Sequence, residues 1–138
     1  LDRALGVVPL LAFHAAANSF PDSVAWERHL GARWVPGESH HPPFGPATIH
    51  KVGDADMTRG LGDFTVQDER YLGLRHSAGS SVLYEHDDEA GGTEPTVWVR
   101  TVDGARAAYD ALGHDARSFD SPTHVEIISR LARWLVRR

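Results

Sequence analysis

The sequence of 138 residues contains no cysteine. This absence excludes disulfide bonds, zinc sites built from thiolates, iron–sulfur clusters and catalytic cysteine nucleophiles. It also fits the reducing cytoplasm, and we expect a cytoplasmic protein.

The sequence also lacks an apolar run long enough to span a membrane. The apolar stretch at residues 7–17 has about half of the roughly 20 residues that a membrane helix needs. Pro9 and His14 interrupt it, so we interpret it as a buried strand rather than a signal segment. Basic residues cluster only near the end of the chain, and the net charge is −5. We therefore expect neither nucleic acid nor membranes as partners.

The composition that remains is that of a globular domain. Hydrophobic residues make up 41% and charged residues 24% of the chain, which argues against disorder. The length suits one domain, covering residues 1–138. Residue patterns predict a helix tail stopped by Gly6, a parallel strand apolar on both faces, a short helix ending at Gly31, several hairpin strands and a final helix. The strands are expected at residues 7–14, 47–52, 80–86, 95–101 and 105–112 and from residue 64, and the final helix at 122–138 with Val125 in its apolar stripe.

Two stretches place polar side chains where an α/β sheet binds ligands. His14 and Asn18 follow the first strand, and ligands bind at the carboxyl ends of strands. Gly113 permits a sharp turn after a later strand, so His114 and Asp115 emerge at another strand end as an acid–base or triad-like pair. A histidine at such a position can also simply bond a backbone carbonyl group.

Two further stretches offer candidates. His40 and His41 lie in a proline-rich loop and point in different directions, so at most one of them is expected to face a given site. In an extended segment Glu69 and Tyr71 would share one face, as a sugar-binding or acid–base pair or as solvated edge residues. The other histidines are expected at the surface, namely His29, His76, His86 and His124.

Several stretches, taken in order, resemble the trehalose-utilisation (ThuA-like) family. They are LLAFHAAANSF, HLGARW, SHHPPFGPATIH, GLGDFTVQDERY, PTVWVR and YDALGHDARSFDSP, and they run from about residue 10 to residue 134. The resemblance implies an α/β fold similar to flavodoxin and the class I glutamine amidotransferases, an open sheet with an inserted β-rich segment. It also implies N-terminal βα units of about 70–100 residues that these 138 residues do not include. We therefore expect either a homo-oligomer or a separate N-terminal half to cover the open sheet edge.

The comparison with the amidotransferases excludes their chemistry. In those enzymes a cysteine follows the central strand, whereas this chain has His14 there and no cysteine, so thioester-based glutamine hydrolysis is chemically unavailable. Ala15 and Ala16 stand where the family usually has glycines, and residues 55–57 replace a common His-Pro motif. The family's Asp-Glu-x-Tyr motif is intact at residues 68–71.

The resemblance implies action on a sugar or an oxidised-sugar derivative in carbohydrate catabolism, of hydrolase, lyase or isomerase type. We expect His114 to be the general acid or base, Asp115 to orient it and Glu69 to be a second acid or base. His14, Asn18, Tyr71 and His41 are expected to bind the substrate. The alternative is a carbohydrate-binding or interaction module without catalytic activity.

A metal-dependent variant is also predicted. His14, His41 and His114, or Glu69 in place of His114, would bind a divalent zinc, manganese or iron ion, leaving one position open for substrate. No other cofactor is expected.

Overall fold

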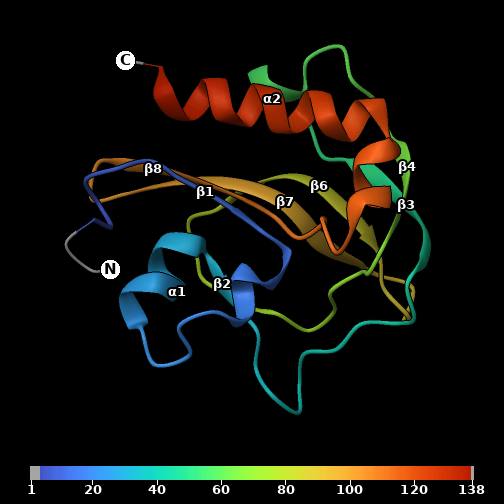
Figure 1. Ribbon diagram of the computed structural model, residues 1–138, viewed down its shortest axis with the longest axis horizontal. Helices are drawn as coiled ribbons and strands as arrows, with labels where there is room; N and C mark the ends of the chain where they lie inside the picture. The colour runs from blue at the N-terminus through green and yellow to red at the C-terminus, as the bar shows by residue number, and fades with distance from the viewer. Residues whose placement is uncertain (1–3, 138) are drawn as a thin grey trace.

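The fold is a curled sheet with helices on both faces, as described by a computed structural model for residues 4–137 (Figure 1). Helix α2 (Pro122–Val136) lies on one face of the sheet, and α1 (Val24–Leu30) lies on the other. The predicted mixed α/β class is confirmed.

Six strands form the main sheet in the order β1-β8-β7-β6-β3-β4. β1 and β8 are parallel and the other neighbours are antiparallel. Two short strands form a second, separate sheet. The main strands are β1 (Leu10–Phe13), β3 (Gly45–Lys51), β4 (Phe64–Asp68), β6 (Ser81–Asp87), β7 (Thr93–Val102) and β8 (Ala105–Asp110); the short ones are β2 (Ala32–Arg33) and β5 (Arg75–His76). Residues 4–137 also contain three 3-10 helices: η1 (His14–Asn18), η2 (Asp56–Thr58) and η3 (Ala116–Asp120).

The first strand is shorter than predicted and lies at the edge of the sheet in the part that the structure describes. Its parallel pairing with β8 agrees with the prediction. The residues before it, Val7 and Val8, are 76% and 53% exposed. Helix α1 covers one face of β1 and α2 covers the other, which accounts for the apolar residues on both faces of the strand. A strand covered in this way can lie at the edge of the sheet.

Local sequence signals account for the turns and the helix ends. The hairpin between β7 and β8 turns at Asp103-Gly104, both with positive φ, as in the tight turns that match strand twist. The Ser23 hydroxyl accepts the Trp26 N–H at 3.1 Å and begins α1. Gly31 ends α1 with φ 93°, and a Cβ there would lie 2.6 Å from Arg100 Nη1 and 2.8 Å from Trp98 Nε1.

The buried stripe of α2 is rotated relative to the prediction. Ile127, Leu131 and Leu135 are buried, as their spacing of four residues requires, but the predicted member Val125 is 43% exposed. The position that completes the stripe is His124, with no exposed surface. The prediction of surface histidines was also wrong for His29 and His86, which are buried as well.

The predicted helix tail at residues 1–5 falls partly outside the described residues, because the description begins at residue 4. Residues 4–7 form a turn, and Gly6 has φ 81°, the left-handed conformation expected of a stop signal. Within residues 4–137, no helix combines the length and the apolar character needed to cross a bilayer.

Candidate functional site

Three side chains from distant parts of the chain meet at one edge of the sheet. His14 directly follows β1, Glu69 directly follows β4, and His114 lies four residues beyond β8. The pairing directions make β1, β8 and β4 point the same way, so their carboxyl ends share this edge. Three strands separate β8 from β4, about 19 Å in a flat sheet. The curl of the sheet closes that distance.

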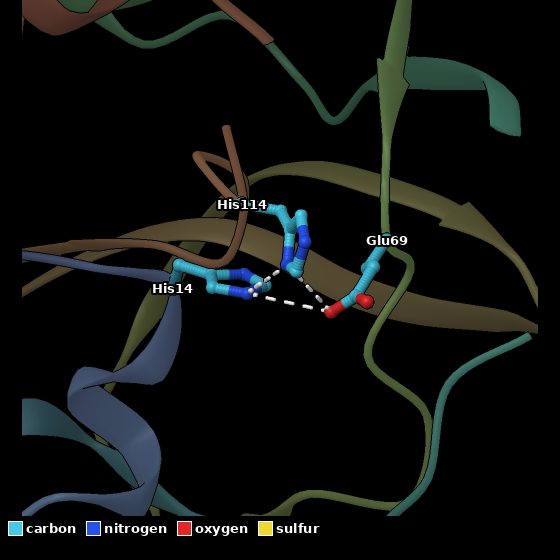
Figure 2. A group of neighbouring side chains, drawn as sticks. All are labelled: His14, Glu69 and His114. Carbon is cyan, nitrogen blue, oxygen red and sulfur yellow. Dashed lines mark hydrogen bonds and ion pairs between the residues drawn. The ribbon is translucent and has the colours of Figure 1, made fainter. Parts of the chain in front are cut away.

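The polar atoms of these residues, the His14–Glu69–His114 cluster, converge closely (Figure 2). The His114 Nδ1 atom lies 3.1 Å from Glu69 Oε2 and 3.2 Å from His14 Nε2. His14 Nε2 lies 3.4 Å from the same carboxylate oxygen. Figure 2 shows the three side chains pointing toward one another from three separate segments.

The environment of His14 fixes its tautomer and its backbone. Its Nδ1 lies 3.1 Å from the carbonyl oxygen of Ala111, which can only accept, so Nδ1 carries a proton and donates it. In the neutral ring, Nε2 then presents a lone pair to the cluster, and the Tyr71 hydroxyl at 2.9 Å donates to it. His14 has φ 40°, a strained conformation for this residue type. The Tyr109 hydroxyl stabilises that conformation by donating to the His14 carbonyl at 2.7 Å.

Asp68 connects the loops that carry Glu69 and His114. Its carboxylate accepts the backbone N–H groups of Glu69 at 2.8 Å, Gly113 at 2.7 Å and His114 at 3.2 Å. Asp68 is 2% exposed. The prediction from sequence assigned no role to this residue. The signal was present, because Phe64, Val66 and Asp68 alternate on the inward face of one strand.

Aromatic rings line the cluster on two sides. The Tyr71 ring lies 4.5 Å from the His14 ring, and Trp34 meets Tyr71 edge-on at 4.9 Å. Phe44 lies 5.6 Å from the His114 ring. Burial, with the charges of Glu69 and Asp68, raises the pKa of the Tyr71 hydroxyl, so the phenol stays protonated as a donor.

His41 reaches the edge of the cluster. Its Nδ1 lies 3.6 Å from Glu69 Oε1, the carboxylate oxygen that faces away from His14 and His114, and 3.0 Å from the Pro42 carbonyl. Its side chain is 36% exposed. His40 points elsewhere, toward Glu89 at 3.7 Å, as expected for adjacent histidines.

Two predicted site residues are not drawn into the cluster. The Asp115 carboxylate caps η3 and pairs with Arg117, and this hydrogen bond with Arg117 lowers the pKa of Asp115 to about 2. Among residues 4–137, Asp115 makes no hydrogen bond to the His114 ring. Asn18 ends η1 with an exposed side chain.

Comparison with known proteins places the chain in a family. The ThuA family model, described as trehalose utilisation, matches residues 6–135. The chain belongs to the ThuA family. No curated protein matches the sequence.

Solved structures of ThuA-like proteins share the fold. One from Parabacteroides merdae superimposes with a TM-score of 0.82 at 18% identity, over 96% of this chain and 62% of that one. One from Bacteroides uniformis gives 0.74 at 19% identity, over 98% and 61%. The ThuA chain described here thus spans about three fifths of their length. A β-galactosidase from Rahnella sp. R3 contains a similar domain, with a TM-score of 0.66 at 17% identity over 99% of this chain and 20% of that one. These likenesses confirm the predicted ThuA-like α/β fold, and an open sheet is consistent with the predicted similarity to flavodoxin and the class I amidotransferases.

Proposed function

We propose that this ThuA protein acts on a sugar or an oxidised-sugar derivative bound at the His14–Glu69–His114 cluster. The observation that supports this proposal is the convergence of two imidazoles and a carboxylate within 3.1–3.4 Å of one another at the carboxyl ends of three strands. Groups at this spacing can exchange protons with a bound hydroxyl or with the carbon beside a carbonyl.

The surroundings of the cluster favour a carbohydrate ligand. Glu69 can accept hydrogen bonds from sugar hydroxyl groups, and the Tyr71 phenol can donate one. Trp34 and Phe44 supply apolar ring faces of the kind that pack against the C–H groups of a sugar. This mixture of a few convergent polar groups and aromatic walls is typical of small-molecule sites.

The roles differ between the two histidines. His114 has a side chain 41% exposed and can reach a substrate from the rim, so we assign it as general acid or base. His14, at 12% exposure and held by Ala111, Tyr71 and Tyr109, is suited to a fixed binding role. Glu69 is the second acid or base. Two proton-transferring groups in contact suit a lyase or an isomerase acting beside a carbonyl group.

The residue that orients His114 is Asp68 rather than Asp115 in this proposal. Asp68 fixes the backbone on both sides of the His114 turn, whereas the carboxylate of Asp115 is occupied by Arg117. Asp115 would then stabilise η3, and the substrate contact expected for Asn18 stays a prediction.

A thermal-shift screen of sugars and oxidised sugars tests the proposal. A ligand present at 100 times its Kd stabilises the native state by about 2.7 kcal/mol. The wild type should show such a shift with at least one member of the panel, and a His114→Ala, Glu69→Gln double variant should not. His50→Ala, which alters a half-buried histidine on β3 outside the cluster, is the matched control and should behave as wild type. If no compound stabilises the wild type more than the double variant, the sugar proposal fails.

A binding module without catalysis is the second candidate function. It is favoured by the pairing of Asp115 with Arg117, because the acid that would complete a triad with His114 is occupied elsewhere. Proton NMR of the sugar identified in the screen separates the two functions. An enzyme converts the sugar over time, or exchanges its protons with solvent deuterium, whereas a binding module leaves it unchanged.

A further inference from the structure

We propose that His14, Glu69 and His114 bind a divalent metal ion, and that zinc suits their geometry. The inference rests on the same three side chains as the proposed function, but both the reasoning and the test use no sugar. It differs from both ligand sets expected from the sequence in leaving out His41 and combining Glu69 with His114.

The spacing of the ligand atoms matches a tetrahedral zinc site. Bonds of about 2.0–2.1 Å at tetrahedral angles place neighbouring ligand atoms about 3.3–3.4 Å apart. The three separations in the structure are 3.1, 3.2 and 3.4 Å. The three atoms therefore form one face of a tetrahedron of nearly the correct size, and the fourth corner stays open for water or substrate.

The lone pairs and the negative charge of the cluster are also suited to a cation. His14 Nε2 presents a lone pair, because the proton of the neutral ring is on Nδ1, and Glu69 Oε2 is an acceptor 3.4 Å away. Besides the Tyr71 hydroxyl, which donates to His14 Nε2, the donor facing these two acceptors is a proton on His114 Nδ1. A divalent ion at the centre would satisfy all three at once.

The atoms around the cluster resemble the outer contacts of metal sites. His14 donates its distal N–H to a backbone carbonyl, the contact that commonly fixes the tautomer of a metal-binding histidine. Asp68 holds Glu69 and His114 by their backbone N–H groups. The ligands are therefore held in place from outside by buried groups.

His41 is outside the proposed ligand set. It approaches Oε1 of Glu69, not the oxygen that faces the two other histidines, and its Nδ1 donates to the Pro42 carbonyl. We assign it to the outer side of Glu69. Tyr71, 2.9 Å from His14 Nε2, lies beside the ligand atoms and is suited to hydrogen bond a water or hydroxyl group at the open corner.

Isothermal titration calorimetry of the metal-depleted chain with zinc chloride tests the inference. We expect one ion per chain, and a loss of affinity of about 100-fold or more for Glu69→Gln and for His114→Ala, since second-sphere changes alone typically cause 10–100-fold losses. Glu69→Gln preserves size and shape, and circular dichroism verifies that each variant is folded. Cobalt(II) provides a second readout, because a four-coordinate site gives intense visible absorption that should disappear in the same variants.

Two controls identify where the metal binds. His41→Ala should change the zinc affinity only a few-fold. His50→Ala disrupts the partly exposed group of His50, Asp63 and Asp87 and should leave the affinity unchanged. Absence of zinc binding by the wild type, or binding that survives Glu69→Gln but is lost in His50→Ala, overturns the inference. Zinc binding without any sugar response would overturn the proposed function alone.

Discussion

Replacing Asp68 by asparagine should both destabilise the protein and weaken its cluster. In the native structure one buried carboxylate accepts three backbone N–H groups, two on Oδ1 and one on Oδ2. An asparagine oxygen can retain the two bonds on Oδ1, but its amide group would then face the N–H of Gly113, 2.7 Å from the lost oxygen. The variant therefore loses one charge-assisted hydrogen bond, and its new amide group and the Gly113 N–H become two donors that face each other.

The size of the loss follows from those contacts. Leaving a buried donor unsatisfied costs about 1–3 kcal/mol, and bonds to charged groups lie at the upper end of that range. We therefore expect a loss of about 2–3 kcal/mol in the free energy of unfolding. For a chain of 138 residues this corresponds to a fall in Tm of roughly 7–10 °C. Asp68→Ala, which removes all three bonds, should lower stability further.

Urea denaturation followed by tryptophan fluorescence measures the free energy, and zinc titration measures the cluster in the same samples. Below the unfolding transition, Asp68→Asn should bind zinc more weakly, because the backbone of Glu69 and His114 is no longer fixed. Asp115→Asn is the control, since its carboxylate is near the surface and paired with Arg117. An Asp68→Asn variant with the stability and zinc affinity of the wild type would refute the role given to Asp68.

Three further changes have predicted outcomes. The first concerns His124, which is fully buried with its Nε2 2.8 Å from Asp110 Oδ2. Burial lowers the pKa of His124, but the hydrogen bond to Asp110 and the charge of Asp110 outweigh burial and raise this pKa overall. The charged pair therefore contributes its full stability below pH 6.5, and this contribution is lost as pH rises through the folded-state pKa of His124. In urea titrations, His124→Gln should lower the free energy of unfolding more at pH 5.5 than at pH 9. An equal loss at both pH values would contradict the charged pair. Gly31→Ala should lower stability by about 1–3 kcal/mol, since φ is 93° and the new Cβ meets Trp98 at 2.8 Å, and a Tm equal to that of the wild type would be incompatible with this geometry. Tyr71→Phe removes the donor to His14 Nε2 and should weaken binding of any sugar found in the screen by about 5–10-fold, the equivalent of one hydrogen bond of about 1–1.5 kcal/mol; unchanged affinity would remove Tyr71 from the site.

Local sequence signals mark most of the helices, strands and turns of this fold, so most of these elements could be predicted. Ser23 and Gly31 mark the ends of α1, Asp103-Gly104 marks the hairpin, and alternation marks β4. The positions of His14 and His114 at strand ends follow from the same signals, because each comes directly after a strand or its turn.

The meeting of Glu69 with the two histidines could not be read from these local signals. Three strands separate β4 from β8 in the sheet, and the curl of the sheet brings their carboxyl ends together. Curl is a property of the assembled sheet and not of any one segment. His124 was predicted at the surface because an isolated histidine in a helix is usually exposed. Its burial depends on Asp110, a partner 14 residues away that supplies the compensating charge.

The most direct test of a single functional centre is a set of long-range ¹H–¹⁵N NMR spectra of the histidine rings. Such spectra report the protonation and metal ligation of each ring nitrogen. During titration with zinc, or with a sugar from the screen, the signals of His14 Nε2 and His114 Nδ1 should shift together, those of His50 should not move, and Glu69→Gln should abolish the joint response. Independent behaviour of His14 and His114, or a response unchanged by Glu69→Gln, would contradict the existence of one centre built from three strand ends.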